Sequence, residues 1–239
     1  MANRWLSNDY AVIYGAEHGT NGSSGNGVIH NIENIRNSKQ ARDNISREFL
    51  TVVDRDEIYE KCGANHNAII EFWNSSLAIA AEKTKGKSKG MILFSAPESY
   101  FKNNQHCTFM MFEEGMGRTF PTNTGMICWY LGMWLTNLSL ASIIRILTSH
   151  NFSIQDGWVH REWTEKEIID TVIKGIDRKL GEDSAILLFQ TMKTVHKLNQ
   201  DVIVSEPVVF EGTLRRIGGE ESGDTVVDSI REEFVKRLC

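Results

Sequence analysis

Residues 126–147 read MICWYLGMWLTNLSLASIIRIL, and Arg145 is the only charged residue among them. An apolar run of about 20 residues is long enough to cross a bilayer as a helix. Polar side chains near the middle of the run argue against a membrane span, as does the lack of a second such run. These polar residues are Thr136, Asn137, Ser139 and Ser142. We therefore expect a buried central helix over residues 126–147 that packs against a sheet, and no membrane partner.

The first half of the chain outside this run predicts both strands and helices. Short apolar runs at 9–14 and 91–95 are typical of buried strands, and an apolar stripe with helical spacing covers residues 65–85. Residues 107–112 favour a second strand beside 91–95, because the intervening loop is too short for the crossover that parallel pairing needs. No repeat or linker interrupts the chain. We expect a single α/β or α+β domain, residues 1–239, with a mixed sheet.

The second half carries local signals for a hairpin and for a helix start. The pair Asp156-Gly157 predicts a turn, so residues 152–163 favour a strand or hairpin. Thr164 followed by Glu167 has the spacing of a capping box, in which a hydroxyl and a carboxylate bind free backbone N–H groups at a helix start. We expect this helix to end at Gly181.

Three segments toward the C-terminus also have apolar patterns. Residues 183–198 fit a helix, and its apolar face would hold Ala185, Leu188, Met192 and Val195. The run AILLFQ within this segment fits a buried strand equally well. Residues 202–217, rich in valine and interrupted by Pro207, favour a pair of strands. Residues 225–239 favour an amphipathic helix.

The bulk composition argues against several function classes. A net charge of −5 and a pI near 5.8 do not suit a surface that neutralises a phosphate backbone, so we expect no nucleic-acid partner. The cysteines lack the close pairs of a zinc ribbon, which favours reduced thiols and a cytoplasmic location. The opening residues, MANRWLSNDY, lack the apolar stretch of a secretory signal peptide. A small molecule is the expected partner, and no pattern specifies a cofactor.

A glycine-rich segment, residues 15–27, follows the first expected strand. A strand, such a loop and a helix can together cradle a phosphate with backbone N–H groups. The segment matches neither G-x-x-x-x-G-K-[ST] nor G-x-G-x-x-G, so a surface loop is the simpler interpretation. If the protein is an enzyme, His18 in this segment is a candidate catalytic residue.

The pair His18-Gly19 after an apolar strand resembles, in outline, the catalytic His-Gly step of caspase-like cysteine peptidases. This resemblance implies His18 as the base and Cys62 as the nucleophile. Cys62 departs from the family pattern, since it lies in YEKCGAN and not at the end of an apolar strand. On one helix Cys62 and His66 would share a face, and a metal site with His106 and Cys107 is conceivable. Gly63 disfavours a continuous helix there. Buried thiols without a metal are the simpler interpretation.

Two groups of residues are candidates for binding a small ligand. Glu113 and Arg118 follow the expected strand 107–112, where a carboxylate and a guanidinium can hold a polar ligand. A solvated turn is the alternative. On the expected central helix, an apolar pocket for a flat ligand would be lined by Trp129, Tyr130 and Trp134. These aromatic residues can equally fill a core.

These patterns favour a small-ligand-binding or regulatory domain without catalytic machinery. The alternative is a hydrolase or a nucleotide-using enzyme with residues 15–27 and His18 at its site. Either function requires that the candidate side chains converge on one cleft, which local patterns do not decide.

Overall fold

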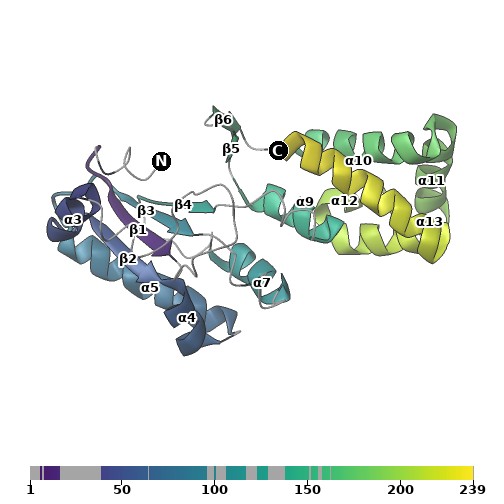
Figure 1. The fold of residues 1–239 in the computed structure, drawn as a ribbon. Coiled ribbons are helices and arrows are strands. Elements are labelled where there is room, and N and C mark those ends of the chain that lie inside the picture. The colour runs from purple at the N-terminus through teal and green to yellow at the C-terminus, as the bar shows by residue number, and fades with distance from the viewer. Residues whose placement is uncertain are drawn as a thin grey trace. The chain divides into compact units, whose positions relative to one another are not determined.

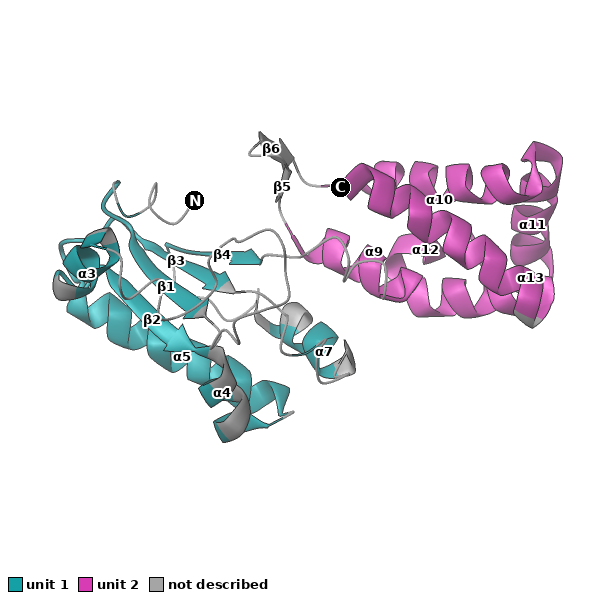
Figure 2. Ribbon diagram, viewed as in Figure 1, with its two compact units in different colours: residues 1–130 teal, residues 131–239 magenta. Residues whose placement is uncertain are grey.

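The computed structural model describes residues 6, 8–16, 39–63, 65–95, 100, 106–116, 123–128, 138–150, 152–155, 158–161 and 163–238. The chain divides into two compact units, residues 1–130 and 131–239 (Figure 2). Each unit has its own set of buried apolar side chains. The expectation that residues 1–239 form a single domain stays a prediction.

The first unit contains a parallel sheet and several helices (Figure 1). Its described elements are β1 Ala11–Ala16, α3 Lys39–Ser46, β2 Leu50–Asp54, α4 Arg55–Cys62, α5 His66–Lys83, β3 Met91–Ser95, α7 His106–Met116 and β4 Thr124–Cys128. The strand order is β2-β1-β3-β4, and each neighbouring pair is parallel. The α/β class is thus confirmed, whereas the expected mixed sheet is wrong for the described strands of this unit.

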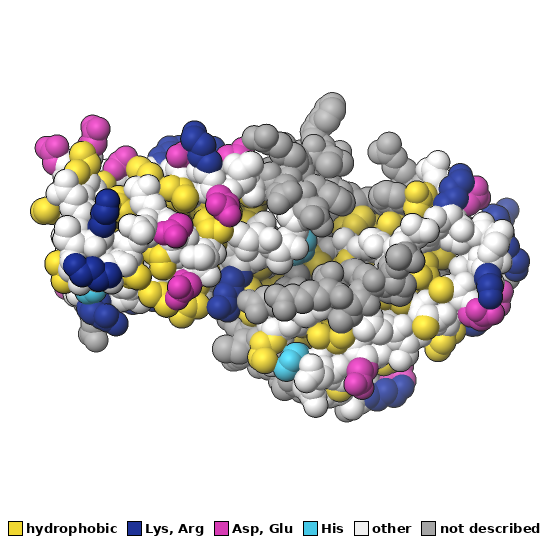
Figure 3. All heavy atoms as spheres, turned by 180° about the vertical axis from the view of Figure 1, so that it is seen from behind, with side chains coloured by type: hydrophobic (Ala, Val, Ile, Leu, Met, Phe, Trp, Pro, Cys, Tyr) yellow, Lys and Arg dark blue, Asp and Glu magenta, His cyan; other side chains and the backbone are white. Residues whose placement is uncertain are grey.

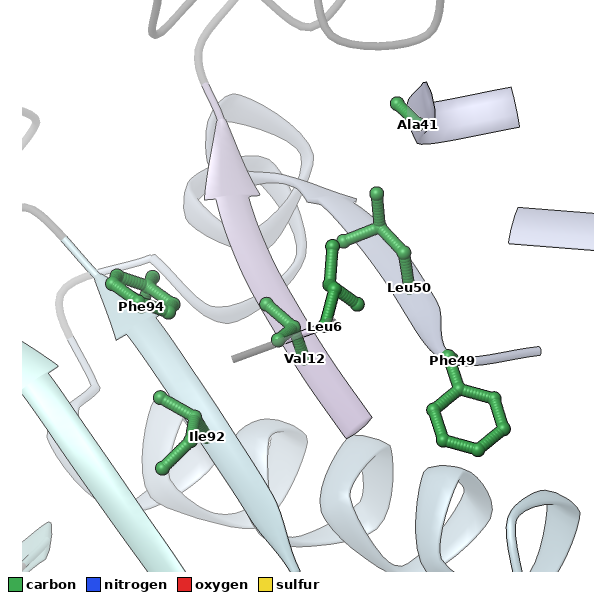
Figure 4. Close-up of a cluster of buried hydrophobic side chains, with 7 residues drawn as sticks. All are labelled: Leu6, Val12, Ala41, Phe49, Leu50, Ile92 and Phe94. Atoms are coloured by element: carbon green, nitrogen blue, oxygen red, sulfur yellow. The ribbon is translucent and has the colours of Figure 1, made fainter. Parts of the chain in front are cut away.

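Apolar side chains cover both faces of this sheet, as parallel sheets require. On one face, Val12 and Ile92 belong to a cluster that also includes Ala41 of α3 (Figure 4). On the opposite face, Ile13 and Leu93 are fully buried. Helix α5 contacts β1 and buries a stripe with helical spacing, which comprises Ile69, Trp73, Leu77 and Ala80. The expected strands at 9–14 and 91–95 and the helix within 65–85 are confirmed.

Residues 107–112 do not form the expected strand, because they lie within α7. Phe109 and Phe112 are both buried, and their spacing of three residues suits one face of a helix. Besides β1, the neighbour of β3 is instead β4, which pairs with it in parallel from Met91 opposite Thr124 to Ser95 opposite Cys128. A short apolar run does not distinguish a strand from a buried helix, and here the helix is the observed form.

The expected central helix over residues 126–147 is also wrong. Residues 126–128 belong to β4, and a helix, α9 Leu140–Ser149, begins only in the second half of the run. Residues 129–137 lie outside the described residues. The start of α9 has a local cause, because the Ser139 Oγ accepts a hydrogen bond from the Ser142 N–H at 3.1 Å. One of the polar residues that interrupt the run therefore caps a helix.

The second unit is mainly helical. Its elements are α9, β5 Phe152–Gln155, β6 Trp158–Arg161, α10 Glu165–Leu180, α11 Glu182–Thr194, α12 Val202–Ser205 and α13 Pro207–Leu238. Strands β5 and β6 form the expected hairpin and pair antiparallel from Phe152 opposite Arg161. The capping box is confirmed: Thr164 Oγ1 accepts from the Glu167 N–H, and Glu167 accepts from the Thr164 N–H. Gly181, with a φ of 82°, ends α10.

The strand pair expected over residues 202–217 is wrong, since these residues form α12 and the start of α13. Pro207 suits the first position of a helix, where its missing N–H is not needed. Phe210 and Leu214 are both buried, and a spacing of four residues places them on one helical face. Farther along, α13 consists of two helical segments that meet at Gly219, whose φ of 72° favours glycine.

Helices α10 and α13 cross closely at Gly175. A Cβ on Gly175 would lie 2.6 Å from the Ile230 Cα, so only glycine fits there. Ser229 Oγ also donates a hydrogen bond of 2.7 Å to the Gly175 carbonyl oxygen. Residues 185–190 are helical in α11, where Ala185, Leu188 and Met192 are buried as expected. Val195 is 68% exposed, so its expected place on the buried face is wrong.

Within the described residues, the helices are too short or too polar to cross a membrane.

Replacement of Leu77 tests the packing of α5 on the sheet. Leu77 is fully buried, and Leu77→Ala should lower the free energy of unfolding by about 3 kcal/mol through a lost apolar contact and a cavity. Ile79 on the same helix is 58% exposed, so Ile79→Ala should change it by about 0.5 kcal/mol or less. Urea unfolding of both variants checks the difference, and equal losses would contradict this arrangement.

Candidate functional site

The carboxyl ends of the parallel strands define one edge of the sheet. Because the strands are parallel and in register, Ala16 of β1 lies opposite Asp54 of β2, and Ser95 of β3 lies opposite Cys128 of β4. The segments that leave all four strands therefore begin at this edge. Side chains far apart in the sequence can meet there.

The strand order creates a switch point between β1 and β3. From β1 the chain continues to β2 on one side of it, whereas β3 and then β4 lie on the other side. Strands β2 and β4 therefore lie on opposite sides of the β1-β3 pair, and open α/β sheets bind ligands in the crevice outside the strand ends at such points. This is the candidate functional site of the first unit.

The described side chains near this edge make contacts that stabilise the fold. The rings of Tyr14 and Phe94 stack with centroids 5.9 Å apart and join β1 to β3 just before the edge. Asp54 Oδ1 accepts a hydrogen bond of 3.3 Å from the Glu57 N–H at the start of α4. Among the residues that the structure describes, no group of three or more metal-ligating side chains gathers.

Most of the predicted site residues lie outside the described residues. These are His18, Arg118, Trp129, Tyr130 and Trp134. By position in the chain, His18 follows the last residue of β1 by two residues, and Trp129 directly follows β4. Glu113 was expected near a strand end but belongs to α7, and its side chain is outside the described part. The structure does not test whether these side chains converge.

Cys62 and His66 do not share one helix. Helix α4 ends at Cys62, Gly63 has a φ of 57°, and Asn65 caps α5 by accepting from the Asn67 and Ala68 N–H groups. Gly63 therefore separates the two helices, so Cys62 and His66 do not lie on one helical face despite their four-residue spacing.

Burial raises the pKa of the Cys62 thiol above its ordinary value of 9.0, although the nearby Lys61 charge opposes this shift. A nucleophilic cysteine needs a lowered pKa, because the thiolate is the reactive form. The environment of Cys62 gives no support to a nucleophilic role.

Each unit has a cavity lined by described residues. The first, of about 260 Å³, lies along β2 and is lined by Ile45, Glu48, Leu50, Thr51, Val52 and Lys83. The second, of about 610 Å³, lies between α10 and α11, where Ile173, Asp177, Ile186 and Phe189 are among the lining residues. Cys62 is the one predicted site residue whose side chain is described, and it lines neither cavity. The sequence contained one signal for the second cavity: Ile186 is apolar but lies off the buried face of α11.

The charged side chains on the described surface are mixed in sign. On the face seen in Figure 3, Lys and Arg side chains alternate with Asp and Glu side chains, and apolar side chains lie between them. The described side chains of that face therefore form no continuous basic track for a phosphate backbone. The expectation of no nucleic-acid partner stays a prediction.

A buried carboxylate, Glu233 of α13, lies among cations in the second unit. Its oxygens lie 3.1 Å from Lys174 Nζ, 2.9 Å from Arg178 Nη1 and 3.1 Å from Lys236 Nζ. Burial by itself raises the pKa of Glu233, but hydrogen bonds and charges from Lys174 and Lys236 outweigh it and lower the pKa below 4.5. Because Glu233 of α13 pairs with cations of α10, it links the two helices. Its role is therefore structural.

The pH dependence of stability tests this role. A carboxylate with a lowered pKa in the folded state stabilises the fold fully above about pH 4.5, and this contribution is lost as the pH falls through the folded-state pKa. We expect Glu233→Gln to lower the free energy of unfolding by about 2 kcal/mol at pH 7. The deficit relative to wild type should shrink below about pH 4.5. Urea unfolding followed by circular dichroism measures both effects.

Glu232 provides the matched control, because it pairs with the same Arg178 but its side chain is largely exposed. Glu232→Gln should change stability by less than about 1 kcal/mol at any pH. A deficit for Glu233→Gln that persists unchanged to pH 3 would refute the ionic role.

Alkylation of Cys62 tests its reactivity. Because burial raises the thiol pKa, the rate of reaction with iodoacetamide should rise with pH through a midpoint above that of a free cysteine. Mass spectrometry of peptides that contain Cys62 gives the rate for this residue alone, with free cysteine as the reference. A midpoint near or below pH 7 would instead indicate an activated thiol.

The comparisons with known proteins assign no identity. No family model, curated protein or solved structure matches this chain significantly. Its function is therefore inferred from its own fold and residues.

Proposed function

We propose that the chain is a small-ligand-binding domain whose ligand binds at the carboxyl edge of the parallel sheet, next to β1 and β3. The strand order β2-β1-β3-β4 is the observation that carries this proposal, because it puts the switch point of the sheet at the ends of these two strands. Ligand sites in open α/β sheets occur preferentially at this position.

The sequence around this edge supports a ligand with a phosphate or another anionic group. The glycine-rich segment 15–27 begins within the last residues of β1, since β1 ends at Ala16. Glycines allow close approach of the backbone, so that its N–H groups can bind an anion.

Aromatic residues near the same edge support a ligand that also has a flat apolar part. Trp129 and Tyr130 directly follow β4, whose last residue, Cys128, lies opposite Ser95 of β3. An aromatic ring can stack on a planar group such as a nucleobase, and a few polar groups then fix its orientation. A nucleotide combines both chemical features and is the best first probe.

The alternative function is a hydrolase or nucleotide-using enzyme. One position in the chain favours it, because His18 follows β1 by two residues and belongs to the segment that leaves the switch point. Its imidazole could act as a general base toward water. The raised pKa of Cys62 speaks against a thiol nucleophile, so this alternative rests on His18.

A binding experiment tests the proposal. Isothermal titration with ATP and with inorganic phosphate should give binding of ATP to the full chain, and Trp129→Ala should weaken it about tenfold, since loss of one stacking contact costs about 1–1.5 kcal/mol. Lys87→Ala is the control, because exposed Lys87 lies at the opposite, amino-terminal end of β3. Circular dichroism checks that both variants fold. No binding, or equal effects of the two variants, would contradict the proposal.

The same samples separate a binding domain from an enzyme. Under the proposed function, wild type binds ATP without releasing phosphate. Phosphate release that His18→Ala abolishes, with ATP binding retained, would instead establish the alternative.

A further inference from the structure

Helix α11 carries large apolar side chains on two different faces. Ala185, Leu188 and Met192 are buried and hold the helix against the second unit. On the remaining surface, Ile186 is 51% exposed and Leu187 is 63% exposed. Removing such side chains from water is favourable by about 25 cal/mol per Å² of apolar surface. This part of α11 therefore lacks a cover within the described residues.

The cavity between α10 and α11 extends this apolar surface. Its volume is about 610 Å³, and Ile173 of α10 lines it together with Ile186 and Phe189 of α11. The apolar surface thus continues from α11 onto its neighbour. A partner that packs along α11 would cover the helix and the mouth of this cavity together.

The two ends of α11 carry opposite charges that have no partner within the described part of the chain. Glu182 begins the helix and Lys193 lies in its last turn. They are eleven residues apart, about 16 Å along the axis, too far to pair with each other. At 100° per residue, Ile186 is about 40° and Lys193 about 20° around the helix from Glu182. All three therefore lie on the same side of α11.

We propose that this surface binds a second copy of the chain, with the two α11 helices antiparallel about a two-fold axis between Ile186 and Phe189. The two-fold axis makes the second α11 run in the opposite direction, and the same side of each helix forms the contact. Glu182 of each copy therefore faces Lys193 of the other. Along the helix axis the midpoint between these residues lies between Ile186 and Phe189, and Phe189 is about 20° around the helix from Glu182, so Ile186 of each copy faces Phe189 of the other at the centre. The charge pattern of α11 is complementary to itself only in this antiparallel arrangement.

Sedimentation equilibrium of the full chain tests the proposal. The wild type is expected to form dimers, and Ile186→Glu should raise the dimer Kd at least tenfold, because it places two carboxylates at the centre of the contact. Val208 of α13 is 55% exposed and lies outside this surface, so Val208→Glu is the matched control and should leave the Kd unchanged. Circular dichroism confirms that both variants fold. A monomeric wild type, or equal effects of the two variants, overturns the proposal.

Charge reversal tests the antiparallel geometry itself. Glu182→Lys alone and Lys193→Glu alone should each raise the Kd about tenfold, since each creates two like-charge contacts across the axis. The double variant restores two opposite-charge contacts, and its Kd should return to within about threefold of wild type. A double variant whose dimer Kd is higher than that of either single variant would overturn the antiparallel pairing. It would also favour a different partner with a fixed charge pattern of its own.

Discussion

The first unit depends on the hydrogen bonding of β1 to parallel strands on both sides. Val12 lies in one row with Leu50 and Ile92, and the next row on the same face joins Tyr14 to Val52 and Phe94. Because the rows are in register, apolar side chains of three strands meet on one surface, which α3 covers (Figure 4). The same register aligns the carboxyl ends of the strands. A single constraint thus creates the core and the edge where a ligand is proposed to bind.

Elements with a strong local signal could be predicted from the sequence, and those that depend on a distant neighbour could not. The capping box at Thr164 and the stripe of α5 are signals within a few residues, and both predictions are confirmed. The run 107–112 is apolar enough for a strand or a helix, and the pairing of β3 with β4 decides against the strand. Within residues 202–217, Phe210 and Leu214 are four residues apart. This spacing fits both the two-residue period of a strand and one face of a helix.

The candidate site was harder to predict than the elements around it. Its position follows from the strand order, which arises from contacts between β1, β2 and β3 and has no signature in any one segment. The sequence did indicate the glycine-rich segment that begins at the end of β1, because glycine content is a local property. Gly63 also indicated that one helix does not continue from Cys62 to His66, and its φ of 57° between α4 and α5 confirms this.

The break in the apolar run 126–147 shows how distant residues determine a local boundary. Ser139 caps α9, but a second acceptor comes from α13: Glu211 Oε2 accepts a hydrogen bond of 2.8 Å from the Ala141 N–H. Glu211 is buried and pairs with Arg215, which in turn binds Asp224 beyond the kink at Gly219. One free N–H group at the start of α9, that of Ala141, is thus bound by a carboxylate seventy residues away in the chain. A helix that continued through residue 139 would leave this carboxylate buried without its backbone donor, so the fold of α13 favours a helix that begins at Leu140.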